Sequence, residues 1–323
     1  MATTVFFLGA TGYIGGPVLA ELSKAHPTTT FIALVRRPES IALVTSFGPN
    51  FIEQQAREAD VVINTANSDN LQLATAILTG QRKRVEVDGK PRGAFVHTSG
   101  AAIFLDPESE GAYDPQGRIW NDGNPADIRA LTPNLLHGDV DVPIMQASET
   151  GYVESHIICP GGVVGVPRGP AQAGSMFFKF LIQLATERKR SCYFGEGTNT
   201  LYLADVNDLI DLFLLVFDRV VSGADKDSSP YERYYIGAIN PVSFKEIMTA
   251  VGEELASRKV LEDGTAASIR YQDVSDPLLR LWGQTQRLEP TRGKSIGWNP
   301  KPVDIRASLS ESVDAVLNPT QSK

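Results

Sequence analysis

A glycine-rich turn near the amino terminus constrains the fold more than any other feature of the chain. It reads Gly9-Ala10-Thr11-Gly12-Tyr13-Ile14-Gly15 and follows the short apolar run Val5 to Leu8. An apolar run of this length that ends in glycine is typical of a buried parallel strand. The residues from Tyr13 to Ala25 carry apolar side chains four positions apart and predict a helix. A strand, a glycine turn and a helix in this order indicate a dinucleotide-binding βαβ unit.

The three glycines of the turn have separate tasks in such a unit. Gly9 permits the tight turn, Gly12 lets the backbone approach a pyrophosphate, and Gly15 lets the helix pack close to the strand. Free N–H groups at the start of the helix then face the anion. The alternative is a turn that packs and binds nothing. We expect a nicotinamide dinucleotide to contact the residues Gly9, Thr11, Gly12, Tyr13, Ile14 and Gly15.

The end of the second predicted strand, Phe31 to Val35, indicates which dinucleotide is bound. An NAD site usually places an acid there, whereas an NADP site places arginine against the 2′-phosphate. Arg36 and Arg37 follow the strand, and the first acid is Glu39. Two guanidinium groups suit a doubly charged phosphate. We therefore expect NADP rather than NAD, the alternative being that both arginines are solvated surface charges.

Short apolar runs alternate with helical patterns along the rest of the chain. Further strands are predicted at Val61–Thr65, Ala94–Thr98, His156–Cys159, Leu201–Leu203 and Tyr234–Ile236. Further helices are predicted at Leu71–Leu78, Met176–Ala185, Val206–Phe217 and Phe244–Ala256. This alternation predicts an α/β fold with a doubly wound parallel sheet. The segment between Val35 and Val61 is so short that we expect the third strand to be short or missing. The Gly-, Pro- and Asp-rich segment from Asp106 to Asn134 predicts a long, functional surface loop.

Composition and charge exclude several classes of protein. The net charge of the 323 residues is −8, which argues against a general nucleic-acid binder. The amino terminus lacks the pattern of a signal peptide, and no stretch approaches the ~20 apolar residues of a membrane span. The histidines show no metal-site spacing, and Cys159 and Cys192 are expected to be buried thiols in a reducing compartment. We expect a cytoplasmic protein without a metal, a membrane or a nucleic-acid partner.

Four further segments extend the pattern that the glycine turn begins. They are Asp60–Ala66 (DVVINTA), Ile158–Gly165 (ICPGGVVG), Gly195–Asn199 (GEGTN) with Leu203–Asp208, and Gly297–Pro300 (GWNP). These resemble the fourth-strand, sixth-strand, G-D-G and closing GWxP motifs of the extended short-chain dehydrogenase/reductase superfamily, which includes the NAD-dependent epimerase/dehydratase-like proteins. The resemblance spans nearly the whole chain.

The resemblance implies a Rossmann domain and a smaller substrate domain. The Rossmann domain would cover residues 1–165 with a return segment at about 200–220, and the C-terminal substrate domain residues 166–199 and 221–323. The chain would return to the sheet around Leu201 to Ala204. The adenine and ribose would lie near Arg36 and Ala66. The nicotinamide would lie near Thr98, Ser99, Pro160, Gly161 and Val163. The family often dimerises, so the resemblance allows a homodimer.

The family's Tyr-x-x-x-Lys catalytic pair is absent from this chain. The segment Leu135 to Val142 stands where the helix with that pair should lie, and the usual arginine of the sixth strand is Cys159. The sequence resembles an atypical branch that includes fungal NAD(P)-binding proteins with a His-x-x-Val-Asp segment, many of them in secondary metabolism. Another atypical branch, the NmrA-like proteins, binds NADP and acts as a sensor.

Some other group must therefore supply a proton. His137 is the first candidate because it lies where the family places its catalytic helix, with Asp139 or Asp141 to orient it. Its alternative role is to cap a surface helix. Ser99 after the fifth strand and Tyr113 in the long loop are further candidates. His97 is expected to pack, and Tyr152 and His156 are expected to be structural.

These observations predict an NADP(H)-dependent oxidoreductase that acts on a small carbonyl or alcohol metabolite. Hydride would pass between the nicotinamide and a substrate held between the two domains. Two alternatives stay open at this point. One is an isomerase, lyase or cyclase on the same fold without net redox change, and the other is a non-catalytic NADP-sensing protein.

Overall fold

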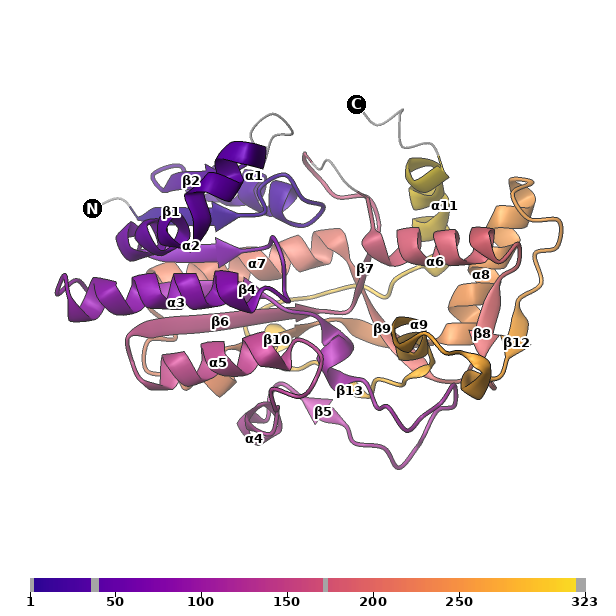
Figure 1. Cartoon of the computed structure of the whole chain (residues 1–323). Coiled ribbons are helices and arrows are strands. Elements are labelled where there is room, and N and C mark those ends of the chain that lie inside the picture. Colours follow the sequence, from indigo (N-terminus) through magenta and orange to yellow (C-terminus); the bar gives the residue numbers. More distant parts are fainter. Residues whose placement is uncertain (1–2, 36–40, 171–173, 318–323) are drawn as a thin grey trace.

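A six-stranded parallel sheet forms the centre of the larger lobe (Figure 1). The computed structural model describes residues 3–35, 41–170 and 174–317. In spatial order, the strands are β10 (Tyr234–Gly237), β6 (Val153–Pro160), β4 (Gly93–Thr98), β3 (Val61–Asn64), β1 (Thr4–Leu8) and β2 (Thr30–Leu34). Every neighbouring pair is parallel. The predicted α/β fold with a parallel Rossmann sheet is confirmed.

Helices cover both faces of this sheet. One face packs against α1 (Gly15–Ala25) and α7 (Val206–Ser222), and the other against α2 (Ile41–Glu58), α3 (Leu71–Glu86) and α5 (Gly138–Glu149). Successive side chains of a strand point to opposite faces of the sheet. Alternate residues of each strand therefore belong to two separate apolar cores, one on each face. Within the described residues α2 is the only element between β2 and β3, so the third strand of the family pattern is missing there, as expected.

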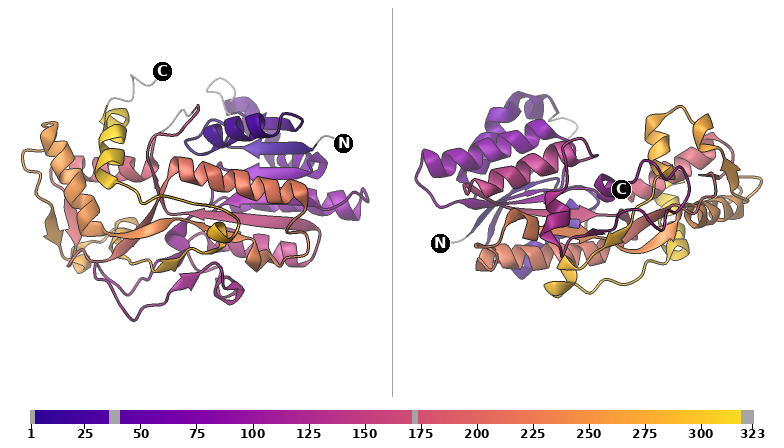
Figure 2. Two further views of the ribbon diagram at one scale, coloured as in Figure 1. Left: turned by 180° about the vertical axis from the view of Figure 1, so that it is seen from behind. Right: turned by 90° about the horizontal axis from the view of Figure 1, so that it is seen from below.

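The second lobe lies at one end of the sheet (Figure 2). It contains a sheet of β7 (Gly162–Val164), β9 (Thr200–Asp205) and β11 (Ile239–Ser243), and a pair of β8 (Cys192–Phe194) and β12 (Ala267–Ile269). The helices α6 (Met176–Glu187), α8 (Phe244–Ser257) and α11 (Ile305–Leu317) share its apolar core. The short elements of the two lobes are α9 (Pro277–Arg280), α10 (Arg292–Ser295) and the 3-10 turns η2 (Ala101–Phe104), η3 (Pro230–Glu232), η4 (Tyr271–Asp273) and η5 (Leu281–Gly283). Of these, η2, η3 and α10 pack against the larger lobe.

The route by which the chain returns to the large sheet differs from the expectation. The strand at Leu201 to Ala204, within β9, pairs with β7 and β11 in the second sheet, so its predicted place in the large sheet is wrong. The chain leaves β6 at Pro160 and continues directly as β7, which gives β9 a partner outside the large sheet. The chain instead comes back to the large sheet as α7, which packs on one face, and as β10, which is the outermost strand beside β6. The remaining domain boundaries stay a prediction.

The segment from Asp106 to Asn134 is not a structureless loop. It contains β5 (Trp120–Asn121), which pairs with β13 (Leu288–Glu289), and α4 (Pro125–Arg129). The fully buried carboxylate of Asp122 accepts backbone hydrogen bonds from Ile236 at 2.8 Å, Thr291 at 2.7 Å and Arg292 at 2.8 Å. This carboxylate fastens the long segment to β10 and to the start of α10.

Two smaller findings concern the other sequence expectations. Cys159 is buried, but Cys192 is only half-buried, so the expectation of two buried thiols is wrong for Cys192. Within the ranges described above, none of the helices has the length and apolar character that crossing a membrane requires.

Candidate active site

The predicted cofactor residues converge on one edge of the large sheet. Because its strands are parallel, their carboxyl ends share that edge, and the chain reverses its winding direction between β1 and β3. Open α/β sheets bind ligands at this kind of switch point. The predicted residues that follow these strand ends are the turn Gly9–Gly15, Ala66, Thr98 and the segment Pro160–Val163. Arg36 and Arg37 lie outside the described residues.

Two glycines of the turn are required by the packing of the protein itself. Gly9 has a φ of 89°, and a Cβ atom there would lie 2.6 Å from the Thr65 side-chain oxygen. A Cβ atom on Gly15 would collide with the Gly9 carbonyl and with that same oxygen. The hydroxyl of Thr65 is fixed in turn, because it donates to the Leu8 carbonyl at 2.8 Å. Gly9 and Gly15 therefore bring the turn close to the end of β3.

Gly12 differs from its two neighbours. Its φ lies outside the left-handed region, and among the described residues a Cβ atom there would meet only the Gly9 carbonyl oxygen, at 3.2 Å. The fold leaves this space open. The first turn of α1 also has no acidic residue and no capping side chain. Gly16 and Val18 donate to the Gly12 and Ile14 carbonyls and Pro17 has no N–H, so the N–H of Gly15 is the one in this turn that no described residue engages. Space beside Gly12 and a free N–H at the helix start are what a pyrophosphate needs, so these residues fit a dinucleotide.

Two hydroxyls near this edge have different environments. Tyr13 donates to the Gly165 carbonyl at 2.6 Å, and burial raises the pKa of its phenol. Its side chain thus holds the turn against the end of β7, and only its backbone is available to a cofactor. Thr98 is buried, and its hydroxyl has no hydrogen-bond partner among the described residues. A ligand bound at this edge can satisfy it.

His137 reaches this edge from the residue immediately before α5. Its φ of 62° is in the left-handed region, which costs a residue other than glycine roughly 1–2 kcal/mol. Backbone N–H groups of Val140 and Asp141 donate to its carbonyl at 3.1 and 2.9 Å and help to hold this conformation. Backbone strain of this kind is often found at functional sites. The ring does not cap the helix, because it makes no hydrogen bond to the free N–H groups.

Both ring nitrogens of His137 face defined groups. Nδ1 pairs with the carboxylate of Asp69, which lies on the loop between β3 and α3. Nε2 lies over Gly100, just after β4, so that a Cβ atom on Gly100 would be only 2.7 Å from it. With Nδ1–H donating to Asp69, Nε2 is the ring atom free to accept or donate a proton. Nε2 thus lies at the carboxyl end of β4.

A buried carboxyl group lies beneath this histidine. Asp141 has no exposed surface, and its Oδ2 atom accepts hydrogen bonds from Ser99 at 2.6 Å and from the Tyr234 hydroxyl at 2.9 Å. Burial raises the pKa of Asp141 to about 6, although the two hydrogen bonds oppose that shift. Burial and the nearby Asp141 also raise the pKa of the Cys159 thiol. Asp141 therefore belongs to the interior and does not orient His137.

The second buried member of this network is His97 on β4. The Asn64 amide donates to its Nδ1 atom across 3.2 Å, while the Asn64 carbonyl oxygen accepts from the Ala66 N–H at 3.1 Å. This orientation of the amide makes Nδ1 an acceptor, so the proton of the neutral ring is on Nε2. His97 Nε2 lies 3.7 Å from Oδ1 of Asp141. Burial, helped by the charge of His137, lowers the pKa of His97 to about 3.

The other catalytic candidates have different surroundings from His137. The ring of Tyr113 is 5.5 Å from the Arg287 guanidinium, and its N–H donates to Thr198 at 3.0 Å. Asp139 is exposed on the first turn of α5. Ser99 is close to the site, but its hydroxyl is used by Asp141. Of the predicted catalytic side chains, His137 therefore has a ring nitrogen at the carboxyl end of β4 that no described residue engages by a hydrogen bond.

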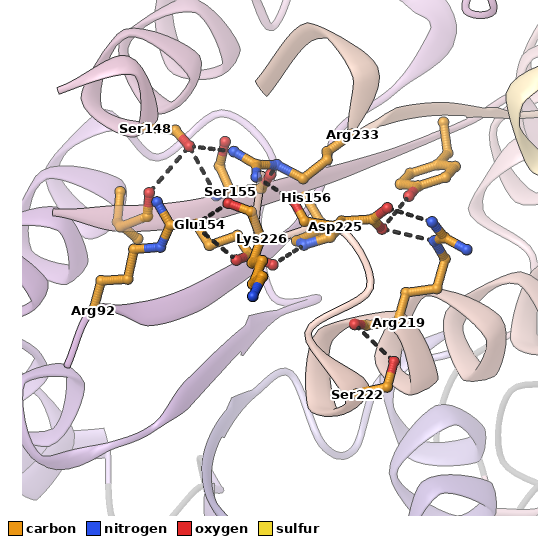
Figure 3. Close-up of polar contacts among 12 residues, drawn as sticks. Arg92, Ser148, Glu154, Ser155, His156, Arg219, Ser222, Asp225, Lys226 and Arg233 are labelled. Carbon is orange, nitrogen blue, oxygen red and sulfur yellow. Dashed lines mark hydrogen bonds and ion pairs between the residues drawn. The ribbon is translucent and has the colours of Figure 1, made fainter. Parts of the chain in front are cut away.

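His156 lies in a separate polar network in the amino-terminal half of β6 (Figure 3). It is fully buried, its Nε2 atom is 2.9 Å from Glu154, and its ring stacks on Tyr235. Arg233 crosses the same region and donates to the hydroxyl of Ser148 and to the Ser155 carbonyl. This network is far along the strand from the cofactor edge, which agrees with the structural role expected for His156.

Asp69 and Gly100 are the functional residues that sequence reasoning missed. Asp69 comes shortly after a predicted buried strand, and residues after such strands gather at the ligand-binding edge. That position was a usable signal for Asp69. Gly100 follows Ser99, and its lack of a side chain leaves space for the imidazole of His137. No local sequence pattern predicts that space.

The chain is similar to known proteins over nearly its whole length. Oxidase ucsJ from Acremonium sp is 22% identical over 93% of this chain and 93% of that protein. DesIV, a dTDP-glucose 4,6-dehydratase from Streptomyces venezuelae solved with NAD and TYD bound, is 14% identical with a TM-score of 0.64, over 99% of this chain and 100% of DesIV. RMD from Pseudomonas aeruginosa, solved with NADPH, is 16% identical with a TM-score of 0.59, over 98% and 99% of the two chains. No protein-family model matches the chain.

These similarities settle the fold. The similar structures include nucleotide-sugar dehydratases and epimerases, so the resemblance to epimerase/dehydratase-like dehydrogenases is confirmed at the level of the fold. Structures with this fold hold NAD in one case and NADPH in another. The fold therefore accommodates a nicotinamide cofactor.

Proposed function

We propose that this protein is an NADP(H)-dependent oxidoreductase that acts on a small carbonyl or alcohol metabolite. The observation that carries the proposal is the placement of His137. Its Nε2 atom lies at the end of β4, on the edge that also carries the uncapped glycine turn, and Asp69 fixes its other nitrogen. A proton-transfer group and a dinucleotide cradle on one edge are the two parts that carbonyl reduction requires.

The chemistry divides between the cofactor and the chain. When bound, the nicotinamide supplies hydride to the carbonyl carbon or takes it from the alcohol carbon. His137, protonated at Nε2, donates a proton to the carbonyl oxygen as the C–O π bond breaks, which gives the alcohol. In the reverse direction the neutral Nε2 atom accepts the hydroxyl proton. No tyrosine–lysine pair is needed, since the imidazole performs the proton transfer.

Asp69 is a positioning residue in this account. Its carboxylate accepts the Nδ1–H hydrogen bond and so keeps the lone pair, or the transferable proton, on Nε2. The Ser68 hydroxyl donates to Oδ2 of this carboxylate at 3.1 Å, and the Asn67 side chain accepts from the Asp69 backbone N–H at 2.9 Å. The His137 backbone, held in the left-handed region, fixes the angle at which the ring approaches Gly100.

The preference for NADP is the part of the proposal that rests on Arg36 and Arg37. These arginines follow β2, whose carboxyl end lies at the same edge as the glycine turn. Their guanidinium groups suit a 2′-phosphate.

Cofactor titration followed by turnover tests the proposal. We expect the purified protein to bind NADPH more tightly than NADH, and Arg36→Ala with Arg37→Ala to remove most of that difference. Arg188→Ala, which removes an exposed arginine from the end of α6, is the matched control. With a panel of aldehydes and ketones we expect NADPH oxidation that His137→Gln abolishes.

Two results would contradict the proposal. If bound NADPH is never consumed across a broad carbonyl panel, a sensor role replaces the reductase. If a substrate is converted with no net change in cofactor absorbance, an isomerase, lyase or cyclase replaces it. Equal affinity for NADPH and NADH would contradict the arginine assignment alone.

A further inference from the structure

Three half-buried aromatic side chains form a group in the second lobe. Phe177 and Phe180 are on the first turns of α6, and Trp282 is in η5. Phe180 stacks on Trp282 with ring centroids 5.0 Å apart and an interplanar angle of 13°. Phe177 packs against the same indole at 5.5 Å. The three rings keep part of their surface exposed, unlike the fully buried Phe178 beside them.

This aromatic group borders the candidate active site. A Cβ atom on Gly162 would lie 2.6 Å from the Phe177 ring, so that ring covers the chain just after β6, next to the expected nicotinamide contacts. Leu105, at the end of the turn that begins at Gly100, packs against the same core. Leu105 and the three rings thus pack on one apolar core, and the Phe177 ring lies against Gly162, beside the expected nicotinamide contacts.

We propose that the substrate carries a planar, apolar ring system that stacks on the Phe177, Phe180 and Trp282 group while its carbonyl or alcohol carbon faces His137. This inference rests on the proposed oxidoreductase function and names the class of substrate for the same site. Aromatic rings favour stacked or edge-to-face partners, and such pairs contribute more than their buried area alone.

The charges around the aromatic group do not favour binding of a nucleoside diphosphate. Arg280, two residues before Trp282, is already engaged, since it donates to the Val274 carbonyl at 2.8 Å and lies over the Tyr271 ring. The single cation of α6, Lys179, is exposed on a different face of the helix from Phe177 and Phe180. Tight recognition of a diphosphate usually employs such cations as direct partners.

Equilibrium dialysis of three probes tests the inference without turnover. The probes are 2-acetonaphthone, its saturated counterpart 2-acetyldecahydronaphthalene, and uridine diphosphate, each with the NADPH-loaded and the cofactor-free protein. We expect 2-acetonaphthone to bind at least about tenfold more tightly than the saturated ketone, and Trp282→Leu to weaken it roughly three- to tenfold. Phe180→Leu should act in the same direction and serves as the second variant.

Trp120→Leu is the matched control, because Trp120 is another half-buried tryptophan that lies in β5 against Phe104. It should leave binding of 2-acetonaphthone unchanged. Equal binding of the two ketones, no effect of either variant, or Trp282-dependent binding of uridine diphosphate would overturn the inference. A different result would contradict the proposed function. If the natural protein neither binds nor oxidises NADPH, it is not an NADPH-dependent oxidoreductase. Binding of 2-acetonaphthone that depends on Trp282 would still support the aromatic site in that case.

Discussion

Asp69 and His137 are 68 positions apart in the chain, and their side chains pair at the carboxyl edge of the large sheet. The pair joins the loop after β3 to the start of α5. Because Nδ1 is used by the carboxylate, the ring can exchange a proton only through Nε2, which faces Gly100. In the proposed function the two residues therefore have different tasks, proton transfer for His137 and positioning for Asp69.

Asp69→Asn should lower kcat by about tenfold to a hundredfold, because the amide can present its N–H to Nδ1 and favour the wrong tautomer. NADPH binding should be unchanged. Asp139→Asn, an exposed acid two residues after His137, is the matched control and should retain full activity. If Asp139→Asn is the more damaging variant, the assignment of Asp69 is wrong. Steady-state kinetics and cofactor titration of the same samples make the comparison.

Gly100→Ala should reduce turnover by up to about a hundredfold, since the added Cβ atom would lie 2.7 Å from Nε2 and must displace the imidazole. Gly117→Ala is the control, because the nearest atom to a Cβ there is at an ordinary 3.4 Å. The thermal unfolding midpoints and kcat of both variants are measured. Full activity in Gly100→Ala would show that the ring position over Gly100 does not matter.

Asp141 should give the protein a pH-dependent stability term. Burial raises the pKa of Asp141 in the folded protein from 3.8 to about 6. Its contribution to the free energy of unfolding is therefore fully present at a pH below 3.8, the pKa in the unfolded chain, and is lost as the pH rises through about 6. Removing the ionisable group should therefore make Asp141→Asn gain stability relative to the natural protein between pH 4 and pH 7. The gain should be on the order of 2–3 kcal/mol.

Urea unfolding of both proteins at several pH values measures this difference. His97, whose pKa is lowered to about 3, acts in the opposite direction in both proteins, since its stability contribution is lost as the pH falls from its unfolded value toward 3. The comparison cancels that contribution as long as His97 keeps its environment. A free-energy difference that does not change with pH would contradict the buried, pKa-raised state of Asp141.

Asp122→Ala should destabilise the protein by about 3 kcal/mol or more, because it leaves the backbone N–H groups of Ile236, Thr291 and Arg292 without their partner in a buried place. Asp114→Ala is the control, since Asp114 is an exposed carboxylate that also accepts a backbone N–H, from Gln116 at 2.8 Å. Urea unfolding should separate the two variants clearly. Equal losses would contradict the role of Asp122 as the fastening of the long segment.

The sequence predicts well those features that depend on neighbours in the chain. The glycine turn and the alternation of strands and helices follow from local patterns, and the structure has both. The third strand of the family pattern is absent from the described residues between β2 and β3, as its short segment predicts. The place of His137 in the chain suggests its role, which stays a prediction. The Arg36–Arg37 assignment is equally local and stays a prediction.

The features that failed depend on contacts between distant segments. The apolar run in β9 has the same pattern whether it joins the large sheet or pairs with β7, and only the path of the chain after Pro160 decides between them. Asp141, four residues after His137, is a reasonable partner on sequence spacing alone. In the structure Asp141 points inward, where Ser99 and Tyr234 donate hydrogen bonds to it. Asp69 pairs with His137 instead.

A single-turnover measurement on NADPH-loaded protein with a carbonyl substrate, comparing the natural chain with His137→Gln, tests proton transfer by His137 directly. We expect NADPH oxidation to slow by about a hundredfold to ten-thousandfold in the variant while its affinity for NADPH stays the same. A rate within about threefold of the natural protein, with the same cofactor affinity, would contradict the role of His137 as the proton-transfer group.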